Sequence, residues 1–113
     1  MVNAKKVIID EALLAATRKY LSETDMELVA RAYNFSEVAH AGQLRLSGEP
    51  FFQHPLHTAL FLAELRLDAS ALAAALLHDV LEDCNVSYEK LKAEFGTEVV
   101  GLVHGVTKLT RTE

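Results

Sequence analysis

The chain has 113 residues, a formal net charge of −5 and a single cysteine, and half of its residues are apolar. This length allows one domain with a true core, which would bury about 65% of the surface that the unfolded chain exposes. The acidic balance argues against binding nucleic acid through a broad basic face. No apolar run approaches the ~20 residues of a membrane span, and a lone cysteine suits the reducing cytoplasm.

The spacing of apolar residues predicts helices along almost the whole chain. The expected helices span about residues 10–20, 23–40, 55–66, 69–82, 87–96 and 97–109. Ser22 or Thr24 can cap the second helix, Asp68 the fourth and Thr97 the last. Residues 42–50 contain two glycines and a proline, which indicates a loop.

The fold class that follows is all-α, a compact bundle of about 5–6 helices with short connections and mostly antiparallel neighbours. Strand signals are almost absent. The last residues, 110–113, carry no helix stop signal, so we expect a single domain over 1–113 whose fold is incomplete at the C-terminus.

The segment 76–83, LLHDVLED, places a histidine and three carboxylates in an apolar run. Burying such groups costs free energy unless they are paired or hold a metal ion. On a helix, His78 and Asp79 point about 100° apart and can share one ion only at the helix edge. Glu82 and Asp83 lie one turn further on.

A third metal ligand has to come from another part of the chain, and His54, just before Pro55, is the best candidate. Imidazole and carboxylate ligands together suit Mn²⁺, Fe²⁺ or Zn²⁺ better than Mg²⁺ or Ca²⁺, which prefer oxygen ligands. The residues therefore predict a transition-metal site made by His54, His78 and Asp79.

Several motifs follow one another along the chain: residues 39–50 (AHAGQLRLSGEP), 54–56 (HPL), 74–83 (AALLHDVLED), 95–96 (FG) and 105–109 (GVTKL). In order and spacing they resemble the N-terminal hydrolase domain of the RelA/SpoT family, a branch of the HD-type phosphohydrolases. The resemblance covers about residues 22–109. It implies that the helical bundle is of the HD phosphohydrolase type.

The resemblance also implies an activity, namely hydrolysis of the 3′-pyrophosphate of (p)ppGpp to GDP or GTP and pyrophosphate in the stringent response, with Mn²⁺ as the usual metal. His54, His78 and Asp79 match three of the family's metal ligands. Glu82 and Asp83 match the acidic pair that acts on the attacking water.

Arg45 matches the arginine that lies against the guanine base, and Ser47 belongs to the same substrate loop. Two features depart from the family's pattern. Leu46 stands where a basic residue is common, and the family's fourth metal ligand, an aspartate in a later segment, is not within the 113 residues.

The resemblance therefore implies that the C-terminal helices of the domain are missing and that this fragment alone is inactive or nearly so. It also implies a longer protein with synthetase and regulatory domains. Apolar side chains on residues 97–109 would be left exposed, which favours a homodimer in a crystal.

We expect structural roles, and not catalytic or metal-binding ones, for the remaining histidines and for the cysteine. For His40, which lies in the family motif, a structural hydrogen bond is favoured over metal ligation. His57 is expected to be solvated or to have a packing role, and His104 is expected at the surface. Cys84 is expected to be a small, partly buried side chain, because no activating histidine is evident beside it.

Two other functions remain open. An HD-type metal phosphohydrolase could act on another nucleotide, although residues 45–48 favour the alarmone and identification of the product would decide. A non-catalytic regulatory helical domain is the second alternative. The acidic residues beside His78 and Asp79 argue against it, because charges in an apolar run are costly without a function, and detection of a bound metal would separate the two.

Overall fold

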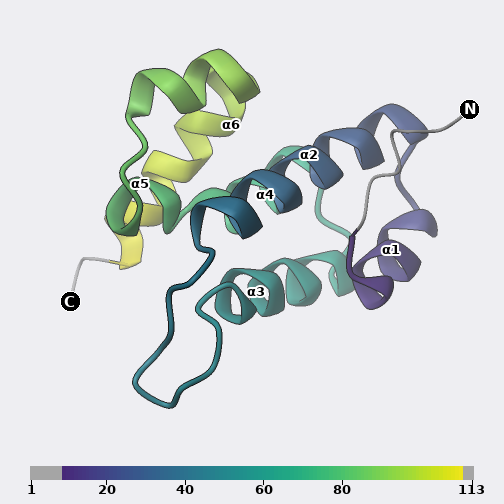
Figure 1. The fold of residues 1–113 in the computed structure, drawn as a ribbon. Coiled ribbons are helices and arrows are strands. Elements are labelled where there is room, and N and C mark those ends of the chain that lie inside the picture. The colour runs from purple at the N-terminus through teal and green to yellow at the C-terminus, as the bar shows by residue number, and fades with distance from the viewer. Residues whose placement is uncertain (1–8, 111–113) are drawn as a thin grey trace, which may run out of the picture.

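The structure is a computed structural model that describes residues 9–110, and within them every side chain except those of residues 82, 83 and 106–110. The helices are α1 (Glu11–Arg18), α2 (Glu23–Ala39), α3 (Gln53–Glu64), α4 (Ala69–Leu77), α5 (Val80–Asp83) and α6 (Tyr88–Thr110) (Figure 1). Within 9–110 the only strand-like feature is an isolated bridge between Leu44 and Pro50. The expectation of an all-α bundle is confirmed.

Side-chain caps fix the starts of several helices. Asp10 Oδ2 accepts a hydrogen bond from the backbone of Ala12 at 3.0 Å, and Ser22 Oγ accepts one from Asp25 at 3.1 Å. Asp68 Oδ1 caps α4 through a 3.0 Å bond from the third residue of that helix. These bonds satisfy amide groups that have no partner within the helix, which explains why the predicted starts of α2 and α4 are confirmed.

The core is centred on α4, which packs against α2, α3 and α6. Figure 1 shows α4 behind α2 and α3 below them, and α4 contacts both of these helices. Leu72, Leu76 and Leu77 are fully buried, as are the alanines between them except for slight exposure of Ala75. Small alanines let the neighbouring helices approach closely, and burial of each leucine contributes about 1.5–3 kcal/mol.

Helix α6 is divided by Gly96, which has φ 92° and ψ 167°. The division agrees with the predicted end of one helix near Gly96 and the start of another at Thr97. Val99, Val100 and Val103 of the second half are buried in the main core, whereas Leu102 is 40% exposed. The expected exposure of apolar side chains over residues 97–109 is therefore found at Leu102 and not at these three valines, while the side chains of Val106 and Leu109 lie outside the described part of the structure. The expected homodimer gains no support from the described residues.

The expected continuous helix over 69–82 is wrong, because it breaks at His78 and Asp79. Helix α4 ends at Leu77, the two residues form a turn, and α5 begins at Val80. In an unbroken helix the carbonyl of Ala75 would accept from the backbone of Asp79. Here it accepts from Nδ1 of His78 instead, at 2.8 Å, so the side chain replaces the helical bond.

Residues 40–52 project from one end of the bundle as a long loop between α2 and α3 (Figure 1). The loop closes on itself: Arg45 N donates to Glu49 O at 2.9 Å and Gly48 N to Arg45 O at 2.8 Å. Gly48 has φ +93°, a conformation that glycine adopts without strain.

Candidate metal centre

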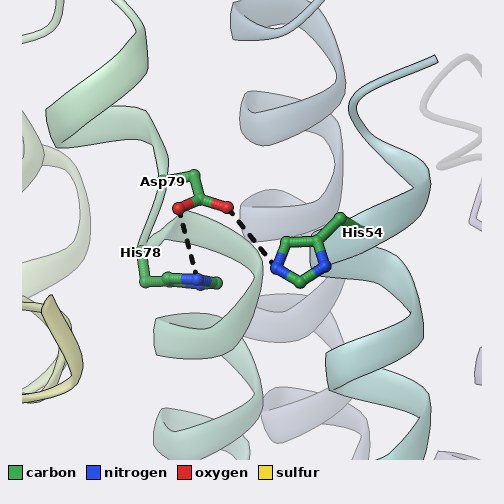
Figure 2. A group of neighbouring side chains, drawn as sticks. All are labelled: His54, His78 and Asp79. Atoms are coloured by element: carbon green, nitrogen blue, oxygen red, sulfur yellow. Dashed lines mark ion pairs between the residues drawn. The ribbon is translucent and has the colours of Figure 1, made fainter. Parts of the chain in front are cut away.

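Three of the predicted site residues meet at one point, although they come from separate parts of the chain. His54 lies in the first turn of α3, and His78 and Asp79 form the turn between α4 and α5 (Figure 2). One nitrogen or oxygen atom from each lies within 4.8 Å of those of the other two. Pro55 keeps the start of α3 regular, since its fixed φ suits a first helical turn.

The carboxylate of Asp79 points between the two imidazole rings (Figure 2). Its Oδ1 atom is 3.3 Å from Nε2 of His78 and its Oδ2 atom is 4.0 Å from Nε2 of His54. The ring centroids of the histidines are 6.0 Å apart. This arrangement leaves a space bounded by two nitrogens and a carboxylate.

The hydrogen bond of His78 decides which of its ring nitrogens faces that space. Nδ1 lies 2.8 Å from the carbonyl oxygen of Ala75 and must donate to it. In the neutral ring Nε2 then carries a lone pair and faces a carboxylate oxygen of Asp79 at 3.3 Å. Two acceptors this close repel each other unless a proton or a metal cation lies between them. A backbone partner of this kind also orients metal-binding histidines.

The three residues fit a transition-metal ion. Three atoms bound to one ion at about 2.1 Å each lie roughly 3.0–3.6 Å from one another. Atoms already within 4.8 Å of one another therefore have to approach by at most about 2 Å. The donors, two imidazole nitrogens and a carboxylate oxygen, are those that Mn²⁺, Fe²⁺ and Zn²⁺ accept.

A cavity of about 380 Å³ opens beside the three residues, between α3, α4 and α6. His54 and His78 form one end of its wall, and the remaining lining is mostly apolar, including Leu62, Ala74 and Leu102. The cavity gives solvent a route to the imidazole rings, and its apolar wall would strengthen electrostatic interactions at that end.

The predicted catalytic pair, Glu82 and Asp83, is placed only through its backbone. Both residues end the four-residue helix α5, which follows directly after Asp79. Their side chains lie outside the described part of the structure. Their catalytic role stays a prediction.

The predicted substrate residues, Arg45 and Ser47, lie in the projecting loop and are exposed. Ser47 Oγ accepts a hydrogen bond from the backbone of Glu49 at 3.3 Å, so its hydroxyl hydrogen remains available. With Leu44, Leu46 and Phe51 they line a hollow of about 640 Å³. Arg45 and Ser47 line this hollow and not the cavity that His54 and His78 line.

Cys84 is partly buried, as expected, although a histidine does lie beside it. Nδ1 of His40 is 3.5 Å from Cys84 Sγ and 3.0 Å from Gln43 Oε1. The predicted structural hydrogen bond of His40 is therefore observed. Local sequence patterns do not predict the contact between His40 and the sulfur of Cys84, because these two residues are 44 positions apart. His104 is exposed, as expected, and His57 is also exposed, which favours the solvated role over the packing role.

None of the helices within residues 9–110 combines the length and the apolar character needed to cross a lipid bilayer.

Comparison with known proteins supports the same interpretation. A family model described as "HD domain" matches residues 32–113. A guanosine-3′,5′-bis(diphosphate) 3′-pyrophosphohydrolase from Vibrio cholerae is 48% identical over 101 residues, which are 89% of this chain and 14% of that protein. A probable GTP pyrophosphokinase from Mycobacterium leprae is 46% identical over 101 residues, 89% of this chain and 13% of that protein.

The bifunctional (p)ppGpp synthase/hydrolase SpoT from Escherichia coli K12 is 44% identical over 101 residues, again 89% of this chain and 14% of that protein. The chain thus spans about one seventh of the length of these curated relatives. The family match extends over well more than half of the chain and includes His54, His78 and Asp79. The chain therefore belongs to the HD domain family and is of the hydrolase-domain type that RelA/SpoT proteins carry.

Proposed function

We propose that the chain is the metal-dependent hydrolase domain of a RelA/SpoT-type protein and releases pyrophosphate from the 3′ position of (p)ppGpp, leaving GDP or GTP. The observation that carries the proposal is the convergence of His54, His78 and Asp79. Two distant segments bring three metal-binding side chains to one point in a chain of the HD family. The names of relatives at 48% and 44% identity support the substrate.

In this proposal His54 and His78 supply imidazole nitrogens and Asp79 supplies a carboxylate oxygen to one divalent cation. Mixed nitrogen and oxygen ligands favour a transition-metal ion over Mg²⁺ and Ca²⁺, and Mn²⁺ is the first candidate because the resemblance to the RelA/SpoT hydrolase domain implies it. A cation bound there supplies positive charge for the phosphate oxygens and makes water more acidic. The chain's net charge of −5 makes such a local positive charge important for an anionic substrate.

Glu82 and Asp83 are proposed to move protons. One carboxylate accepts a proton from the attacking water, which requires a hydrogen-bond distance in the complex with substrate. Two adjacent carboxylates repel each other, so one of them can stay protonated and act as the acid. Arg45 is planar and always charged, so it can stack on guanine or bind phosphate, and Ser47 offers a hydroxyl from the same loop.

The wider setting is part of the proposal. The Vibrio cholerae relative is about seven times as long as its matched segment, and we infer that synthetase and regulatory domains accompany this domain in its natural protein. The metal-dependent chemistry and the guanine nucleotide substrate are consistent with a cytoplasmic protein that binds neither nucleic acid nor membrane.

The experiment that tests this function uses a chimera. Residues of this chain replace the 101 matched residues of the Vibrio cholerae protein, and release of pyrophosphate from ppGpp is measured with Mn²⁺. The 113-residue chain is assayed beside it. We expect hydrolysis by the chimera and its loss in the Asp79→Ala variant, because one ligand of the cation is removed. His57→Ala, an exposed residue in α3, is the matched control and should leave the rate unchanged.

A chimera that binds Mn²⁺ and folds but hydrolyses no ppGpp would contradict the substrate assignment. In that case, pyrophosphate or phosphate release from other nucleotides would favour an HD phosphohydrolase of different specificity. Equal rates for the Asp79→Ala and parent chimeras would contradict the metal centre itself.

A further inference from the structure

A second group of polar side chains meets around His40, outside the proposed metal ligands. His40 follows the last residue of α2 and is 2% exposed. Its Nδ1 atom lies 3.0 Å from Gln43 Oε1 and 3.5 Å from Cys84 Sγ. An amide oxygen can only accept, so Nδ1 carries a hydrogen and donates it to Gln43. One buried ring thus joins the end of α2 to two other segments.

His40 contacts both ends of the loop that carries Arg45. At the start of the loop, Gln43 accepts the bond from His40, and its backbone oxygen accepts from Phe51 N at 2.9 Å. At the far end, the ring of Phe51 stacks on His40, with centroids 4.9 Å apart and planes 22° apart. The rings of Phe51 and His54 also meet in a T-shaped arrangement, with centroids 6.5 Å apart.

Cys84 brings the third segment into the group. It follows Glu82 and Asp83 directly, and its backbone nitrogen donates to Val80 O at 3.1 Å at the end of α5. Its sulfur also lies 3.7 Å from Nε2 of Gln43. The sulfur contacts therefore connect the end of α5 to the start of the loop.

Packing alone does not account for a histidine at position 40. Its Nε2 atom is buried and has no hydrogen-bond partner within the described part of the chain, and the same holds for Ser36 Oγ one turn earlier. A buried polar atom without a partner costs free energy. Phenylalanine would keep the stack on Phe51 without that cost, but it would lose the hydrogen bond to Gln43, so the histidine is needed for the link to the loop and not for packing.

We propose that His40 is a positioning residue for the hydrolysis proposed above. It holds the Arg45 loop against the segment that follows Glu82 and Asp83, so that the nucleotide-binding and proton-transferring groups keep one spacing. The inference rests on the proposed function and adds a residue that belongs to neither the metal ligands nor the substrate contacts. Fixed spacing matters because small misplacements of reacting groups lower rates steeply.

The test uses the 113-residue chain with two substitutions of the same residue. His40→Phe keeps a ring of similar shape but removes the donor to Gln43, whereas His40→Asn can restore a donor near the Nδ1 position. Ser36→Ala is the matched control, since it removes the other unpartnered buried group without touching the loop. The measurements are amide hydrogen exchange at Arg45 and Gly48, the Kd of Mn²⁺, and the Kd of ppGpp in the presence of Mn²⁺.

We expect His40→Phe to raise exchange at these loop amides about tenfold, because local opening becomes easier. Binding of ppGpp should weaken by about fivefold, since the loop is ordered less well before binding, while the Kd of Mn²⁺ stays the same. His40→Asn should recover part of both effects, and Ser36→Ala should show neither.

Unchanged loop exchange and unchanged ppGpp binding in His40→Phe would overturn the proposal, as would a general loss of stability without a specific change in the loop. Failure of the unsubstituted chain and of the chimera to bind ppGpp would instead count against the proposed function. The exchange measurement separates the two cases, because it reports on the link between His40 and the loop without any nucleotide.

Discussion

His54 and His78 face the same carboxylate from very different surroundings. The side chain of His54 is 47% exposed, whereas that of His78 is 7% exposed. Only His78 is held by a buried hydrogen bond, to the carbonyl of Ala75 at 2.8 Å. His78 and Asp79 therefore form the preorganised part of the proposed metal centre. A cation would reach these two residues from the side of His54 (Figure 2).

The buried histidine can be tested without disturbing the turn that contains it. Asparagine in place of His78 can still donate to Ala75 O but offers no nitrogen at the Nε2 position. We expect His78→Asn to fold as before and to bind Mn²⁺ at least about 100-fold more weakly, since even the loss of an outer partner costs about 10–100-fold. Isothermal titration calorimetry measures the affinity.

His57→Asn is the control for that experiment, because it makes the same substitution at an exposed position of α3. It should leave the affinity for Mn²⁺ unchanged. If His78→Asn bound Mn²⁺ as tightly as the parent chain, His78 would not be a ligand.

Metal binding should also raise the thermal stability of the chain. Binding to the folded state alone adds about 2.7 kcal/mol when the free metal is at 100 times its Kd, which for a domain of this size raises Tm by roughly 10 °C. A thermal melt with Mn²⁺, and again after excess EDTA, measures the change. Asp79→Ala should show no shift, and a shift of equal size in that variant would place the bound metal elsewhere.

Glu82 is predicted to act on a proton and not on the metal. Glu82→Gln keeps the shape of the side chain but removes the proton acceptor, so kcat of the chimera should fall by about 10²–10⁴-fold. The affinity for Mn²⁺, measured by titration, should not change. Loss of metal binding with normal turnover at high Mn²⁺ would reverse this assignment.

The parts of the fold that local chemistry determines are predictable from the sequence. Ser22 and Asp68 are residue types that cap helices, and both side chains accept the predicted type of bond. Gly96 is predicted to end a helix, and its positive φ divides α6. Each of these features depends on residues within one turn of the position, which a sequence shows directly.

Features that depend on distant residues are not predictable in the same way. At the break, the carbonyl of Ala75 accepts from the side chain of His78, and helical periodicity does not predict such a side-chain bond. The contact between His40 and Cys84 joins residues 44 positions apart. Their proximity depends on how α2, the loop and α5 pack together, and such tertiary contacts override local patterns.

Arg45 is predicted to bind the nucleotide and not to take part in bond cleavage. Arg45→Gln in the chimera should raise KM for ppGpp by about 10–100-fold, the effect of losing one charged contact of about 1.5–3 kcal/mol. It should leave kcat nearly unchanged, because the lost interaction is equally strong in the ground state and the transition state. Arg18→Gln, at an exposed position of α1, is the control; equal KM values for the two variants would contradict the role of Arg45.

The division of α6 at Gly96 can be tested with two alanine substitutions of opposite expected sign. A methyl group added at either Gly96 or Gly101 would meet no atom within 4 Å, so steric contact does not distinguish the two positions. Gly96 has φ +92° and ψ 167°, a conformation that costs a residue with a side chain about 1–3 kcal/mol. Gly101 lies inside the helix, where alanine is preferred by about 0.5–1 kcal/mol.

Gly96→Ala should therefore lower the free energy of unfolding measured with urea, and Gly101→Ala should raise it. The segment after Gly96 carries Leu102, which lines the cavity beside His54 and His78. A shift of that segment should also weaken Mn²⁺ binding in Gly96→Ala, whereas Gly101→Ala should keep the parent affinity. Equal destabilisation by both substitutions would show that the backbone at Gly96 is not what sets the direction of the final helix.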